Sequence, residues 1–120
     1  MPLSRRDPAN LFDMLEASEK VHRFLKNKTF EDFLKDDMLQ AAVERNIGII
    51  GEAARRISEE LKQEHPEIPW RKIIAQRNVL IHEYGDIDYK EIWDVATSHL
   101  LRLIEQIRPL IPPLPPDMES

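Results

Sequence analysis

The side chains best suited to chemistry in this chain are concentrated in eight residues, from Arg77 to Tyr84. Arg77, Asn78, His82 and Tyr84 bring a cation, an amide, an imidazole and a phenol into a segment that is otherwise largely aliphatic. A guanidinium can bind a phosphate through two hydrogen bonds and keeps its charge at any working pH. A histidine ionises near neutral pH and can accept or donate a proton. These residue types are the ones that phosphodiester chemistry needs.

RNA is the substrate class that needs the fewest catalytic groups, because the 2′-hydroxyl of each ribose can itself act as the nucleophile. Cleavage then needs a base for that proton, a cation to stabilise the phosphorane, and an acid for the leaving 5′-oxygen. His82 could serve as base or acid and Arg77 as the cation. The four histidines form no H-x-x-x-H pair, so we expect no metal and no cofactor.

The spacing of these residues on a helix divides them between two faces. Asn78 and His82 are four apart and share a face, so the amide can orient the imidazole. Arg77 and Tyr84 share another face, and Arg77 lies about 140° around the axis from His82. The two converge in one chain only if Arg77 reaches around or the helix ends at His82. Otherwise two copies pool their side chains across a two-fold axis, or the set is simply a buried polar network.

Helices must position this stretch, because apolar residues recur every three or four positions and no strand-like alternation occurs. The predicted helices span about 8–26, 37–63, 70 to 82 or 84, and 88–108, with a short helical turn near 29–34. Short connections between four long helices predict an all-α, up-down bundle. We expect one domain over residues 1–108 and a proline-rich tail over 109–120.

Several helix starts carry capping signals. Asp7 followed by Pro8 is suited to open the first helix, and Asp36 precedes the longest one. Thr29 to Asp32 and Asp88 to Glu91 match the pattern of a capping box. Within the helix predicted over 37–63, Gly48 and a second glycine three residues later each cost about 1 kcal/mol relative to alanine. We therefore expect another backbone to approach closely there.

Composition limits the function classes. With 120 residues and no cysteine, the chain is long enough for one domain and has no disulfide framework. No apolar run approaches a membrane span and no secretory signal is apparent, so we expect a cytoplasmic protein that contacts no membrane. A net charge of -5 argues against a non-specific nucleic-acid coat protein. Residues 69–82 nevertheless hold three cations, Arg71, Lys72 and Arg77, and no acid.

The stretch from Arg77 to Tyr84 resembles the R-x-x-x-x-H-x-Y signature of the HepT-like toxins, a branch of the HEPN-domain ribonucleases. The segments AVERNIGIIGEAARRISEEL, HPEIPWRKIIAQRNVLIHEY and DYKEIWDVA are also similar to that family, in order and spacing. The resemblance covers residues 8–108. Two positions depart from it: Gly85 stands where an aromatic residue is common, and Gly48 where a longer polar residue is common.

The resemblance implies a HEPN-like homodimer with the signature in a cleft between the two copies. It implies a metal-independent endoribonuclease that is the toxin of a type VII-like toxin–antitoxin pair, with tRNA as one candidate substrate. The implied antitoxin is a minimal nucleotidyltransferase that adenylylates the signature tyrosine. By motif position Arg77 and His82 would be catalytic, Asn78 supporting and Tyr84 the modified residue. The alternative is a non-catalytic helical dimer that binds a nucleotidyltransferase or a nucleotide.

Overall fold

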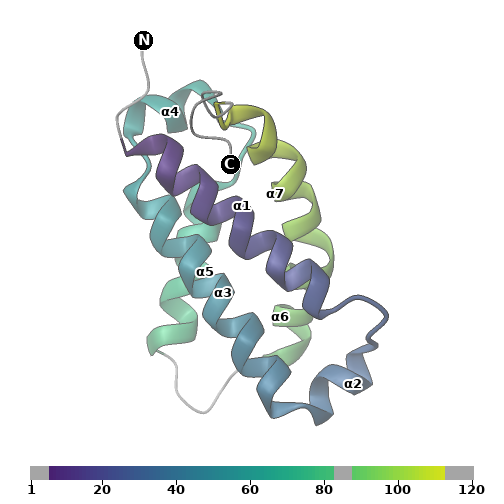
Figure 1. Cartoon of the computed structure of the whole chain (residues 1–120). Coiled ribbons are helices and arrows are strands. Elements are labelled where there is room, and N and C mark those ends of the chain that lie inside the picture. Colours follow the sequence, from purple (N-terminus) through teal and green to yellow (C-terminus); the bar gives the residue numbers. More distant parts are fainter. Residues whose placement is uncertain (1–5, 83–87, 113–120) are drawn as a thin grey trace.

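The computed structural model describes residues 6–82 and 88–112, and for residues 77–82 it describes the backbone alone. Every regular element in these ranges is helical, which confirms the all-α prediction, and neither range contains a strand. The long helices α1, α3 and α5 and the run from α6 to α7 alternate in direction along the bundle (Figure 1). Helix α1 packs against α3 and α7, and α3 packs against α5.

Helix α1 (Asp7–Phe24) and the short helix α2 (Phe30–Lys35) are joined by a tight turn. Asn27 adopts a positive φ of 64° in this turn, a conformation that asparagine tolerates better than most residues. The predicted capping box at α2 is confirmed. The Thr29 hydroxyl accepts from the Asp32 amide at 3.1 Å, and the Asp32 carboxylate accepts from the Thr29 amide at 2.9 Å. This backbone hydrogen bond lowers the pKa of Asp32.

Helix α3 (Asp37–Arg56) begins where predicted, with the Asp36 carboxylate accepting from the Leu39 amide at 3.0 Å. Its buried stripe faces α1 and α5 and comprises Val43, Ile47, Ile50, Ala53 and Ala54. The predicted close backbone approach is wrong at Gly48, where an added Cβ would meet nothing within 4 Å. Gly48 instead lies on an open face of the helix. Its low helix propensity is therefore not offset by a close packing contact.

The helix predicted over 37–63 is in fact two helices, because the chain leaves helical geometry at Ile57 and Ser58. Both residues are extended, with ψ of 141° and 149°, and α4 (Glu59–Glu64) follows. The Ser58 hydroxyl caps α4 by accepting from the Leu61 amide at 3.2 Å. A serine hydroxyl that bonds to nearby backbone amides favours the end of one helix and the start of the next over a continuous helix. The apolar stripe continues through Ile57 and Leu61, both buried, which is why the periodicity gave no sign of the break.

A carboxylate from the first helix holds this break in place. The Asp7 carboxylate accepts from the Ser58 amide at 2.9 Å and from the Ser58 hydroxyl at 2.6 Å. The prediction that Asp7 caps α1 is therefore wrong: it occupies the first turn of α1, and the residue at the N-cap is Arg6. A buried carboxylate must be satisfied, and the nearest available donors belong to Ser58 rather than to its own helix.

Helix α5 (Trp70–His82) starts at the predicted residue. Trp70 is buried, and its indole nitrogen donates to the backbone carbonyl of His65 at 3.0 Å. This bond ties the start of α5 to the chain that leaves α4. Helix α5 then descends beside α3 in the opposite direction (Figure 1).

The helix predicted over 88–108 is one helical run with a change of hydrogen-bond pattern in the middle. It comprises α6 (Tyr89–Asp94), a π-helical segment (Val95–His99), α7 (Leu100–Ile107) and a final 3₁₀ turn (Arg108–Leu110). The Asp88 carboxylate caps it by accepting from the Glu91 amide at 3.1 Å. Aromatic rings of Phe30, Phe33 and Trp93 pack together where α2 meets this run. No helix in the described ranges is long and apolar enough to cross a membrane.

Candidate functional site

Three of the four predicted site residues lie on the second half of α5. The backbone of Arg77, Asn78 and His82 is helical there. Their side chains, and Tyr84 as a whole, lie outside the described residues. Because the backbone is helical from Arg77 to His82, these two positions lie about 140° apart around the helix axis.

Helix α3 carries a carboxylate at the level of this stretch. Helices α3 and α5 run antiparallel (Figure 1), and Ile47 of α3 and Gln76 of α5 line the same pocket. The turn of α3 before Ile47 is therefore on the side of the α5 residues that follow Gln76. Glu44 is in that turn, and one of its carboxylate oxygens is buried without a hydrogen-bond partner among the described residues. Burial raises the pKa of Glu44. A carboxyl group with a raised pKa is a frequent feature of functional sites, and the sequence analysis gave Glu44 no role.

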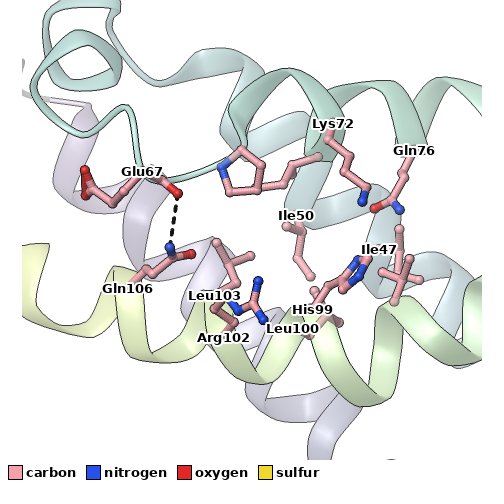
Figure 2. A pocket seen from close by; sticks show the side chains of 13 residues that line it. Ile47, Ile50, Glu67, Lys72, Gln76, His99, Leu100, Arg102, Leu103 and Gln106 are labelled. Carbon is pink, nitrogen blue, oxygen red and sulfur yellow. Dashed lines mark hydrogen bonds between the residues drawn. The ribbon is translucent and has the colours of Figure 1, made fainter.

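A pocket of about 270 Å³ opens between α3, α5 and α7, directly ahead of Arg77 along α5. Its floor is apolar and is formed by Ile47, Ile50, Ile73, Leu100 and Leu103. Polar side chains surround this floor: Lys72 and Gln76 from α5, and His99, Arg102 and Gln106 from the opposite helical run (Figure 2). An apolar floor with a few polar groups is the usual composition of a small-ligand site.

The pocket is electropositive although the chain is acidic. None of the side chains of Lys72, His99 and Arg102 forms an ion pair with a carboxylate in the described part of the chain. The one acid on the rim, Glu67, has its carboxylate 3.2 Å from the ring nitrogen of His65. Its backbone carbonyl accepts from Gln106 at 3.2 Å, and its carboxylate points away from the pocket (Figure 2).

The π-helical segment helps to set the composition of this rim. One extra residue per turn between Val95 and His99 shifts the helical register, and His99 closes the segment on the pocket side. The hydroxyl of Thr97 accompanies the distortion by donating to the Trp93 carbonyl at 2.7 Å. Such π segments occur often at functional sites.

This cluster was not predicted from the sequence, where the four histidines, His99 among them, were considered only as possible metal ligands. The available signal was weaker: Arg102 follows His99 by three residues and therefore shares its helix face. Lys72, across the pocket, is 27 positions earlier in the chain, and only the fold brings it near. In the described ranges, no three histidine or carboxylate side chains gather as a metal ion would require.

Comparison with known proteins identifies the family. The family model described as Ribonuclease HepT-like matches residues 14–110. A Thermococcus cleftensis protein named "Probable ribonuclease HepT" is 45% identical over 90 residues, covering 75% of this chain and 82% of its own. No solved structure matches significantly.

Two further relatives carry ribonuclease names. A Methanocaldococcus jannaschii protein named a "Putative RNase" is 34% identical over 106 residues, covering 88% of this chain and 97% of its own. A protein of the same description from Caldanaerobacter subterraneus is 34% identical over 98 residues, covering 82% and 88%. The family match includes the whole of α3, α5 and α7 and hence both the predicted stretch and the basic pocket. The chain belongs to the HepT-like ribonuclease family.

Proposed function

We propose that this chain is a metal-independent endoribonuclease in which Arg77 and His82 are catalytic and Asn78 orients the imidazole. The observation that carries the proposal is the helical backbone of α5 through Arg77 and His82, inside the segment matched by the ribonuclease family. His82 moves the protons of the 2′-hydroxyl and the 5′-oxygen, and Arg77 stabilises the charge that develops on the phosphorus oxygens.

A homodimer would complete this site. Arg77 and His82 are five residues apart, which corresponds to about 7.5 Å along the axis and about 140° around it. A single helix therefore presents them in divergent directions. Two copies of α5 facing each other across a two-fold axis would supply two imidazoles, one as base and one as acid, to the same phosphate.

Control by a partner is the remaining part of the proposal. The protein acts as the toxin of a type VII-like toxin–antitoxin pair, and a minimal nucleotidyltransferase silences it by adenylylating Tyr84. Tyr84 is two residues beyond His82, so a nucleotide attached there would add bulk and negative charge beside the RNA path. The family membership supports this proposal.

The test is RNA cleavage by the purified full-length chain in the presence of EDTA. We expect the wild type to cut and to leave a 2′,3′-cyclic phosphate, and His82→Ala to cut about 10²- to 10⁴-fold more slowly. Circular dichroism and thermal unfolding of His82→Ala should match the wild type. Equal inactivity of the two proteins on RNA, or cleavage that EDTA abolishes, would reject the proposal.

A subunit-mixing experiment tests whether the site is shared. Wild type and His82→Ala are denatured together, refolded at a constant total concentration and assayed. If each site needs both imidazoles of a two-fold dimer, an equal mixture retains about a quarter of the wild-type activity. Sites contained within single chains would retain about half.

A further inference from the structure

The geometry points to the pocket between α5 and α7 as a second phosphate-binding site, in which Lys72, His99 and Arg102 hold a backbone phosphate of the RNA beside the one that is cut. This inference rests on the proposed ribonuclease function and adds to it the path of the substrate. It assigns a role to side chains on a helical run that the R-x-x-x-x-H-x-Y signature does not include.

The chemistry of the rim selects an anion. Lys72 and Gln76 extend from α5 toward the imidazole of His99, and the guanidinium of Arg102 lies on the same helical run as His99 (Figure 2). All of these groups offer N–H donors, and a guanidinium can bind a phosphate through two of them. Because the Glu67 carboxylate lies beside His65, the described residues provide no carboxylate partner for Lys72 or Arg102.

The dimensions fit part of a nucleotide rather than a whole folded ligand. The pocket volume of about 270 Å³ is slightly below the range of about 300–1,000 Å³ that is typical of sites enclosing drug-sized molecules. The aliphatic floor of Ile47, Leu100 and Leu103 offers a surface for a sugar or a base, while the cations at the rim face solvent. An open pocket of this kind suits a polymer that passes over it.

The location connects the pocket to the proposed catalytic residues. Gln76, on the rim, is the residue before Arg77, and Ile73, in the floor, is one helical turn before Arg77. From Lys72 to His82 the helix rises about 15 Å. A single strand lying along α5 would therefore contact the pocket and the catalytic stretch with nearby phosphates of the same strand.

The negative net charge of the chain means that RNA binding depends on local clusters of cations such as this pocket. At -5 the protein as a whole repels RNA, so binding depends on local positive groups. Residues 69–82 contain three cations and no acid, and the fold adds the cation Arg102 and the N–H donor of His99 from the opposite helical run to the same surface. The α5–α7 face thus offers RNA an electrostatically favourable path on an otherwise acidic molecule.

The experiment compares the double variant Lys72→Ala/Arg102→Ala with a matched control, Arg23→Ala/Lys26→Ala. The control also removes one lysine and one arginine from exposed positions, which lie in the last turn of α1 and just after it and are outside the pocket. The probe is a fluorescein-labelled single-stranded RNA with 2′-O-methyl groups, which cannot be cut through its own 2′-oxygen. Affinity is read from fluorescence anisotropy over a series of salt concentrations.

We expect the pocket variant to bind the probe at least about tenfold more weakly and to reduce the slope of log K against log salt by about 0.7, the value for one lost phosphate contact on a single strand. The control should change affinity by less than about twofold. With cleavable RNA, KM should rise while kcat at saturating RNA stays close to the wild type. Lys72→Arg in place of Lys72→Ala should restore part of the affinity.

Three results would overturn the inference. One is an unchanged affinity and salt slope in the pocket variant. Another is a loss of self-association in sedimentation that accounts for the weaker binding, which would make the pocket a contact between copies. The third is tighter binding of AMP than of the RNA probe, lost in the same variant, which would make it a mononucleotide site. Failure of the ribonuclease function is separate, because the wild type would then cut no RNA.

Discussion

Asp7 and Ser58 are 51 positions apart in the chain and are joined by two hydrogen bonds, one of 2.9 Å to the Ser58 amide and one of 2.6 Å to its hydroxyl. Asp7 is 1% exposed. Ser58 in turn caps α4, so one pair of side chains fixes the first turn of α1, the end of α3 and the start of α4.

Asp7→Ala should therefore destabilise the protein by about 2–4 kcal/mol, because it leaves the half-buried amide and hydroxyl of Ser58 without this charged acceptor. Urea unfolding at pH 7 measures this change. The matched control is Asp13→Ala on an exposed position of the same helix, for which we expect less than about 0.5 kcal/mol. Equal effects of the two substitutions would show that the Asp7–Ser58 pair contributes no special stability.

Phe33 should be the most sensitive residue of the junction between α2 and α6. Its side chain is fully buried, with ring centroids 6.1 Å from Tyr89 and 5.7 Å from Trp93. Phe33→Ala would leave a cavity and should lower the free energy of unfolding by about 3–5 kcal/mol. Phe12→Ala, at a position that is 50% exposed, should cost less than about 1 kcal/mol. Similar costs for both would mean that the aromatic junction relaxes around the cavity.

Glu44 gives a prediction about pH. Burial raises its pKa above the ordinary glutamate value, so the folded protein holds this proton to higher pH than the unfolded chain does. The folded state then binds more protons, and this group lowers stability as pH rises from about 4.5 through the raised pKa. Glu44→Gln should consequently be more stable than the wild type at pH 7, by a few tenths of a kcal/mol after solvent screening.

The difference in unfolding free energy between Glu44→Gln and the wild type, followed from pH 7 downward, checks this. It should shrink as the pH falls below the ordinary glutamate range, where both states of the wild type are protonated. Glu105→Gln, on an exposed position of α7, serves as the control and should show no such trend. A constant difference across the range would mean that Glu44 keeps an ordinary pKa.

Tyr84 should act as a point of control rather than as a catalytic group. Tyr84→Phe should cleave RNA within about threefold of the wild type, since the proposed proton transfers use His82. Incubated with ATP and the cognate nucleotidyltransferase, the wild type should gain the mass of an adenylyl group and lose activity. Tyr84→Phe should do neither. Modification of Tyr84→Phe to the same extent would move the target to another residue.

Local signals in the sequence were sufficient for the helices and for some of their ends. The capping box of Thr29 and Asp32 and the cap at Asp36 join groups three residues apart, and both were predicted correctly. The apolar periodicity placed α1 and α5 within a few residues of their observed bounds, and it placed the start of α3 but not its end. The spacing of Arg77 and His82 likewise identified a candidate site, because helix geometry relates positions that are close in the chain.

Features that depend on residues distant in the chain could be seen only in the folded structure. A local rule assigns Asp7 to the start of its own helix, yet its partner is Ser58, which also breaks the helix predicted to run through it. His99 looked isolated until the fold brought Lys72 to the other side of the same pocket. Periodicity reports which face of a helix is buried, but burial and charge at a given point depend on which other helix arrives there. The amino-acid pattern was enough to predict the helices, apart from the break at Ile57 and Ser58, and a set of residue types suited to RNA chemistry. The packing of α5 against α3 and α7 is what forms the pocket beside them.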